Sequence, residues 1–393
     1  FFPMHITGLA GMPRRVWTYP GNLGWDLLNM ISTVGAFTIA AGVLVFIIDL
    51  ILNFRISNAG AGNPWKAGTL EWLPGDVYSS RSIPHITSRY PLWDQPGLAD
   101  EVESGAHYLP DAPTGGRETI VTSAIEAEPQ YVLQMPGAGW SQVLAAAFTA
   151  AFFLLLTVKL VIPAAVCGVL ALAFIIVWVW KLDPGPDKGM VDIGGGIRLP
   201  TYFSGPQSHG WWAMVVLMLV AASLFLAYVF SYFYLWLVSP DVWAPAHAPA
   251  PPDPVWPMLS GGAMAGAAVL FWLAGRLLPK AGQRSPAAPL LTAVAALLLV
   301  AGVGAELWGH WQTGLRAPDS AYAAIVYMAP LLTGQIAVAV LLMAGFVVAR
   351  LILGKVDRER RNSFDHVAIL AWYGAAQGLL ALLLVHGFPR VMG

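Results

Sequence analysis

The sequence has 393 residues, of which 57% are hydrophobic and 11% are charged, and its formal net charge is −1. A soluble domain carries about 25% charged residues, so this composition excludes an ordinary soluble protein and favours helices that cross a membrane. There is no basic tail that would bind nucleic acid, and the single cysteine excludes an intrachain disulfide.

Eight apolar runs are long enough to span a bilayer. The first is separated from the second by a polar segment rich in Pro, Gly and Ser, residues 53–139. We therefore predict an all-α, polytopic membrane protein with about eight transmembrane helices. The expected spans, in chain order, are about Leu28–Leu52, Trp140–Leu160, Pro163–Lys181, Gly210–Val238, Met258–Leu278, Leu290–Trp311, Ala321–Leu353 and Asp365–His386.

The Lys and Arg residues predict the orientation of these spans, because cations accumulate in cytoplasmic loops. Of the 21 Lys and Arg, five fall on the side predicted to be outside, namely Arg14, Arg15, Lys159, Arg316 and Arg390. Both termini are then outside. Arg14 and Arg15 form an adjacent pair on the side that disfavours cations, which indicates a specific anionic partner. The alternative is a pair of interfacial anchors that reach to lipid headgroups.

The residues around this pair carry a resemblance to a known family. They read Phe1-Phe2-Pro3-x-His5, Gly8-Leu9-x-Gly11-Met12-Pro13-Arg14-Arg15 and Tyr19-Pro20. This order resembles the end of the eleventh helix of subunit I in haem-copper cytochrome c oxidases. Trp25, Asn29, Ile31, Ser32, Gly35 and Phe37 resemble its twelfth helix. The resemblance implies that Arg14 and Arg15 contact haem propionates. Thr18 departs from the family, where many members carry an acid, and this puts a proton-exit role at that position in doubt.

The polar segment continues the resemblance. Gly68–Pro74, Arg81–Ile86 and Ser88–Asp94 look like the cytoplasmic tail that follows helix twelve of subunit I. Its prolines and aromatic residues favour an extended strap on a partner surface. We therefore expect residues 1–95 to be the end of subunit I and residues 96–139 to be a linker.

Residues 140–393 resemble a divergent oxidase subunit III with seven helices, as in bacterial chains that fuse subunits I and III. The match includes His209–Met214 and Phe230–Tyr234. Two histidines of the family are replaced by Thr333 and Ile336, and the family's buried carboxylate is missing from Met218–Ser223. A role for that acid in proton uptake is therefore not carried over.

Glu306 lies near the outer end of the sixth span. Acids inside a membrane are costly, so each is a candidate functional residue. A glutamate stands at this place in the family's fifth subunit III helix, and a role in proton or lipid handling is one hypothesis. The alternatives are a structural hydrogen bond between helices and exposure at the membrane interface.

The eight histidines supply no haem or copper site, because none are adjacent or separated by one residue. Metal chemistry needs convergent imidazoles, so we expect no metal ligands and no catalytic residue in this chain. His5 is interpreted as a helix-end histidine satisfied by a backbone group. The haem and copper ligands of the family lie on earlier helices, and this chain, which does not begin with Met, is expected to be part of a longer protein.

The resemblance implies an aerobic respiratory terminal oxidase that reduces oxygen to water and pumps protons. Its expected partners are the rest of subunit I, subunit II, cytochrome c through subunit II, and phospholipid, in a bacterial inner (plasma) membrane. The isolated chain is not expected to be active. Three alternatives stay open: a structural or assembly subunit without redox centres, a quinol oxidase of the same superfamily, and a secondary transporter. The transporter is disfavoured because no mid-membrane charge pairs or repeated halves are visible.

Overall fold

The computed structural model describes residues 1–56, 63–73, 82–111, 116–135, 137, 139–182, 189–243 and 250–392. The chain divides into two compact units. Unit 1 comprises residues 1–78 and 84–106, and unit 2 comprises residues 79–83 and 107–393. The boundary at residue 106 falls inside the segment that the sequence suggests is a linker. Three residues used in the sequence analysis lie outside the described residues, namely Pro74, Arg81 and Lys188.

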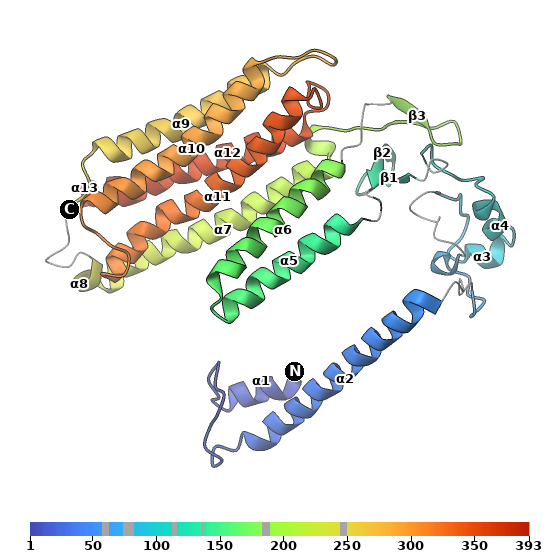
Figure 1. Ribbon diagram of the computed structural model, residues 1–393, viewed down its shortest axis with the longest axis horizontal. Helices are drawn as coiled ribbons and strands as arrows, with labels where there is room; N and C mark the ends of the chain where they lie inside the picture. Colours follow the sequence, from blue (N-terminus) through green and yellow to red (C-terminus); the bar gives the residue numbers. More distant parts are fainter. Residues whose placement is uncertain are drawn as a thin grey trace. The chain divides into compact units, whose positions relative to one another are not determined.

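Within the described residues, eight helices are long and apolar enough to cross a membrane, and the predicted all-α polytopic fold is confirmed (Figure 1). Their bounds are α2 (Asp26–Ile56), α5 (Trp140–Thr157), α6 (Val161–Lys181), α7 (His209–Val238), α9 (Val255–Arg276), α10 (Ala287–Gln312), α11 (Ala321–Ile352) and α12 (Asn362–Leu382). The last helix continues through the π-helix η4 (Leu383–Gly387) into α13 (Phe388–Met392), and α8 (Pro240–Trp243) follows α7.

Unit 1 begins with α1 (Phe2–Leu9), which packs against α2. None of the most apolar part of α2 is buried by the other residues that the structure describes. Its large residues are therefore exposed on every face; Phe37 and Phe46, for example, are 72% and 63% exposed. An apolar helix without a polar face needs lipid or other helices around it.

The tail after α2 is more compact than the predicted strap. It contains η1 (Leu70–Trp72), α3 (Pro91–Asp94) and α4 (Leu98–Glu103). Leu73, Leu98 and Val102 form a small buried core. The indole of Trp93 lies on Gly68, where a Cβ atom would be 2.6 Å from the ring, and its Nε1 donates to the Lys66 carbonyl at 2.8 Å. Glycine is therefore required at position 68.

Among its described residues, unit 2 contains two β-hairpins, one before α5 and one between α6 and α7. β1 (Arg117–Thr122) pairs antiparallel with β2 (Pro129–Met135), and β3 (Met190–Asp192) pairs antiparallel with β4 (Arg198–Pro200). The first hairpin and α4 both lie within the predicted linker, so the described part of that segment has regular structure.

The first hairpin and the segment after the second contact the first turns of two membrane helices. The Tyr131 hydroxyl lies 3.0 Å from Nδ1 of His209, at the start of α7. The Tyr202 hydroxyl accepts a hydrogen bond from the backbone N–H of Asn362, at the start of α12, at 2.9 Å. Burial raises the pKa of Tyr202 to about 12, although this bond opposes the shift. The phenol therefore stays protonated at neutral pH.

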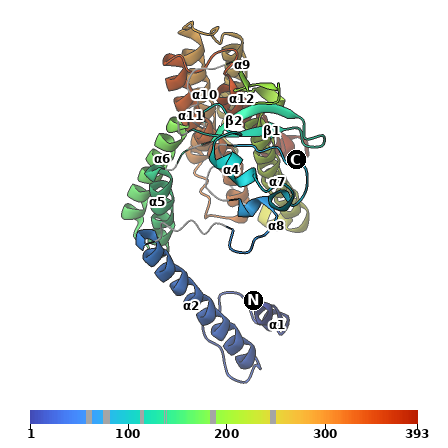
Figure 2. The same ribbon diagram turned by 90° about the vertical axis from the view of Figure 1, so that its right-hand side faces the viewer.

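The expected second and third spans leave only Val161 and Ile162 between them, which predicts a tight helical hairpin. The structure contains this hairpin, with its turn earlier in the chain. α5 and α6 lie side by side (Figure 1 and Figure 2), and only Val158–Leu160 separate them. Lys159 has a φ of 62°, the left-handed conformation that reverses the chain here. Phe148 and Phe174 stack across the pair with ring centroids 5.6 Å apart.

The core of unit 2 lies among α9, α10, α11 and α12. Phe271, Leu299, Val340 and Phe364, one from each helix, are at most 1% exposed. The α9–α10 and α11–α12 loops lie at one end of this bundle, and the α5–α6 turn and the α10–α11 loop lie at the other (Figure 1). These two cation-rich loops of unit 2 therefore lie at the same end of the bundle.

Asp357 organises the loop between α11 and α12. Its carboxylate accepts hydrogen bonds from Arg360 Nε and Nη2 at 3.0 and 2.8 Å, and from the backbone N–H of Glu359 at 2.9 Å. Burial alone would raise the pKa of this carboxyl, but the bonds from Arg360 and Glu359 together hold it below its ordinary value.

We expect Asp357→Asn to destabilise unit 2 by about 2 kcal/mol at pH 7, because bonds to a charged acceptor are lost. A carboxyl whose pKa is lowered by folding contributes stability above the pKa of the unfolded chain, about 4. That contribution is lost as the pH falls through the folded pKa. The difference between wild type and variant in thermal unfolding should therefore narrow below about pH 4. An equal difference at pH 7 and at strongly acidic pH would contradict this.

Candidate functional site

The arginine pair predicted to bind an anion lies in the turn that follows α1. Arg14 and Arg15 are both exposed. Arg15 has a φ of 63°, a conformation that residues other than glycine seldom adopt. Among the described residues, neither guanidinium has a hydrogen-bond or ion-pair partner. Both are therefore free to bind a ligand supplied from outside the chain.

The turn is held on both sides of the pair by the first residues of α2. Trp25 Nε1 donates to the carbonyl of Ala10 at 3.1 Å, before the arginines. Asn29 Nδ2 donates to the hydroxyl of Tyr19 at 2.8 Å, after them, and lies 3.5 Å from Met12 Sδ. The Tyr19 and Trp25 rings also pack edge to face. The backbone that carries the arginines is thus fixed while their side chains are not.

This geometry fits a dianionic ligand such as the two propionates of a haem. Each guanidinium offers a planar fork of donors that matches one carboxylate. Thr18 is exposed beside the turn, and His5 is exposed on α1. Neither joins the hydrogen bonds that anchor the turn.

A second site, which the sequence analysis does not assemble, lies inside unit 2. Glu306 and His310 are one helical turn apart on α10, and His386 reaches them from η4. Oε1 of Glu306 lies 3.0 Å from Nε2 of His310 and 2.6 Å from Nε2 of His386. The three residues are 5%, 2% and 7% exposed. The predicted structural hydrogen bond between helices is therefore present at Glu306, and it links two histidines.

The histidine count misses this cluster because it considers only spacing between histidines. Here a glutamate provides the third group, and one histidine lies 80 residues away in sequence. The i, i+4 spacing of Glu306 and His310 is a local signal that could have been noticed, because such residues share a helix face. The contribution of His386 depends on the tertiary structure. The prediction that the chain has no metal ligands is based on the spacing between histidines alone, so it does not consider a carboxylate ligand.

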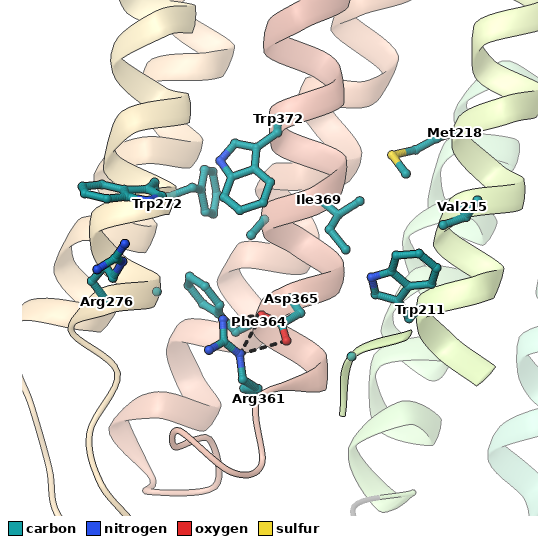
Figure 3. Close-up of a pocket in the computed structure, with 14 residues that line it drawn as sticks. Trp211, Val215, Met218, Trp272, Arg276, Arg361, Phe364, Asp365, Ile369 and Trp372 are labelled. Carbon is teal, nitrogen blue, oxygen red and sulfur yellow. Dashed lines mark hydrogen bonds and ion pairs between the residues drawn. The ribbon is translucent and has the colours of Figure 1, made fainter. Parts of the chain in front are cut away.

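A cavity of about 440 Å³ lies between α7, α9 and α12 at the cation-rich end (Figure 3). Trp211, Trp272 and Trp372 line it. Arg361 makes a bidentate ion pair with Asp365 at its edge, at 2.8–2.9 Å, and the Arg276 guanidinium lies 4.9 Å from the Trp272 ring centroid. Indole rings beside arginines are typical of a membrane–water interface.

These features define a helical, polytopic membrane protein with an exposed arginine pair in one unit and a buried Glu–His–His cluster in the other. No family model matches the chain. Part of it is similar to proteins named oxidase subunit 1. Cytochrome c oxidase subunit 1 of Alkalihalophilus pseudofirmus is 42% identical over 97 residues, which cover 24% of this chain and 16% of that protein.

Two further relatives give the same picture. Quinol oxidase subunit 1 of Bacillus subtilis is 40% identical over 95 residues, 23% of this chain and 15% of that protein. Cytochrome c oxidase subunit 1 of Bacillus sp. is 35% identical over 119 residues, 29% of this chain and 18% of that protein. The chain thus contains an oxidase-related part, and its matches span only 15% to 18% of the length of these relatives.

Proposed function

We propose that this chain is part of a haem-copper terminal oxidase that reduces oxygen to water and pumps protons, in a bacterial inner membrane. The observation that carries the proposal is the similarity to oxidase subunit 1 together with the exposed, unpaired Arg14 and Arg15. In this proposal the two arginines bind the propionates of a haem whose iron ligands lie outside this chain. Copper is likewise bound elsewhere in the complex.

The arginines would act by charge. Haem supplies the electron-transfer and oxygen chemistry when it is bound. The guanidiniums of Arg14 and Arg15 would neutralise the propionates and favour the reduced state of the iron, because positive charge stabilises an added electron. Trp25 and Asn29 would keep the turn in place, since their bonds flank the pair.

The exposure of α2 supports a partner for unit 1. This helix is apolar on all faces and is not buried by the described chain. We infer that part of its surface packs on the remainder of subunit I and the rest on lipid. Subunit II and cytochrome c would join the assembly beyond this chain.

For residues 140–393 we propose the role of a subunit III-like support domain that binds phospholipid. The tryptophan-lined cavity of Figure 3 suits acyl chains and an anionic headgroup, because Arg276 lies beside an apolar interior while Arg361 is already paired with Asp365. A second apolar cavity of about 400 Å³ lies between α6 and the helices α11 and α12.

The electron donor is cytochrome c or a quinol. Relatives named for each donor have nearly the same identity to this chain, 42% and 40%. The donor would dock on a subunit other than this one. A structural membrane subunit without redox centres is the remaining alternative for the chain taken by itself.

The proposal is tested by purifying the complex from its native membranes through an affinity tag on this chain. We expect cyanide-sensitive oxygen consumption to co-purify, supported by either reduced cytochrome c or a quinol. A second tagged membrane protein from the same cells is the control. A stable complex that consumes no oxygen with either donor would refute the oxidase proposal and leave the purely structural subunit.

A further inference from the structure

The buried Glu306, His310 and His386 converge on one point. Their ligand atoms all lie within 4.8 Å of one another. The two imidazoles are nearly parallel, with centroids 5.2 Å apart and planes at 14°, and both direct Nε2 at the same oxygen of Glu306. We propose that these three residues bind a divalent transition-metal ion of the zinc class. This proposal is independent of the oxidase proposal, because it concerns unit 2 alone.

A hydrogen-bonded triad explains these contacts only in part. A buried carboxylate that served only as an acceptor would be best satisfied with one donor on each oxygen. Here both imidazoles approach Oε1, and Oε2 of Glu306 is buried without a hydrogen-bond partner. An ion held by the three residues would give this unpartnered oxygen a partner.

The ligand atoms of this cluster favour zinc over other divalent ions. Two imidazoles and one carboxylate are the ligands of many zinc sites, in which water or another group occupies the fourth position. Hard ions such as Mg²⁺ and Ca²⁺ prefer oxygen ligands, so the two nitrogens disfavour them. Ligands around tetrahedral zinc lie roughly 3.3–3.5 Å apart, given bonds of about 2.0–2.2 Å. The present separations of 2.6 and 3.0 Å need only a small expansion.

The backbone at His386 supports a dedicated site. The helix widens into η4 at Leu383–Gly387, and His386 lies inside this single π-turn. Such turns are rare and occur often at functional sites, because they rotate the following side chains relative to the α-helix. Glu306 and His310 lie in the last two turns of α10, so an ion would enter from the nearby end of the bundle.

The first test measures zinc bound by the full chain in detergent after incubation with Zn²⁺ and removal of free ion. We expect about one Zn²⁺ per chain in wild type and close to none in Glu306→Gln and His310→Gln. His366→Gln is the matched control, since it removes a partly buried histidine of α12 outside the cluster. Mutation of residues that hydrogen-bond to metal ligands typically lowers metal affinity by about 10–100-fold. Loss of a ligand itself should therefore lower the affinity for zinc by at least that factor.

The second test stays informative if the Gln variants fold poorly. The His386→Cys variant keeps three ligands, so it should still bind one ion. With Co²⁺ in place of Zn²⁺ it should gain a thiolate-to-metal charge-transfer band in the near ultraviolet, which wild type lacks. A folded wild type that binds no Zn²⁺ or Co²⁺ would overturn the proposal. So would zinc binding that is the same in wild type, Glu306→Gln and His310→Gln, or a Cys variant without the new band.

Discussion

Replacement of both Arg14 and Arg15 by Met is expected to lower the reduction potential of the adjacent haem in the complete oxidase and to slow turnover. Two positive charges would be lost from the vicinity of an iron that accepts an electron. A single charge about 10 Å away at an effective dielectric constant near 20 changes a potential by on the order of tens of millivolts.

A redox titration of the purified complex, followed by optical absorbance of the haem, measures this shift. Lys159→Met is the matched control. Lys159 is also predicted to lie on the outer side, but in the α5–α6 turn of unit 2. It should leave potential and turnover unchanged. If the double variant had wild-type potential and wild-type turnover, the arginines would be interfacial anchors and not propionate ligands.

Gly302→Leu is expected to destabilise unit 2 by about 2–3 kcal/mol, the upper part of the range for overpacked cores. Gly302 lies on α10 where α9 crosses it. A Cβ atom there would be 3.0 Å from the carbonyl oxygen of Ser260, a backbone atom that cannot turn away, and 3.0 Å from Met264. Helices in membranes associate through such close contacts at small residues. A leucine would push α9 and α10 apart.

Gly304→Leu, two residues along the same helix, is the matched control. No atom lies within 4 Å of the position that its Cβ would occupy. It should be neutral or slightly stabilising, because leucine favours helix more than glycine does. Thermal unfolding followed by circular dichroism at one scan rate compares the two. We expect a midpoint about 5 °C lower for Gly302→Leu. Equal midpoints for both variants would show that α9 and α10 do not pack as described.

The membrane helices are predictable from the sequence because the signal is strong and local. Each span is a long apolar run, and the observed bounds lie within a few residues of those expected. The turn between α5 and α6 is misplaced because Val161 and Ile162 are apolar and indistinguishable from helix by composition. The chain reverses instead at Lys159, whose left-handed backbone no propensity would indicate.

In the segment 96–139, composition does not reveal the regular structure of the described residues. Its prolines, glycines and charges suggest a linker. The hairpin strands nevertheless have the β-branched and aromatic content of strands, with Thr119, Ile120 and Val121 opposite Leu133, Val132 and Tyr131. Two short strands without a turn signal between them are easily overlooked. The packing of Leu98 and Val102 in α4 is likewise a short-range feature hidden by polar neighbours.

The candidate sites differ in how far the sequence predicts them. The arginine pair is contiguous, so its identity follows from the sequence, and the structure adds the anchors from Trp25 and Asn29. Glu306 is predictable as a costly intramembrane acid. Its partner His386 is not, because the contact joins α10 to a π-turn whose position only the folded chain defines.

We propose that this chain belongs to a haem-copper terminal oxidase. The most direct test is the dithionite-reduced minus air-oxidised absorbance spectrum of the complex purified through this chain. We predict haem absorbance in the difference spectrum, at a fixed ratio of haem to chain. A difference spectrum without haem bands, from a complex in which unit 1 is intact, would contradict the account.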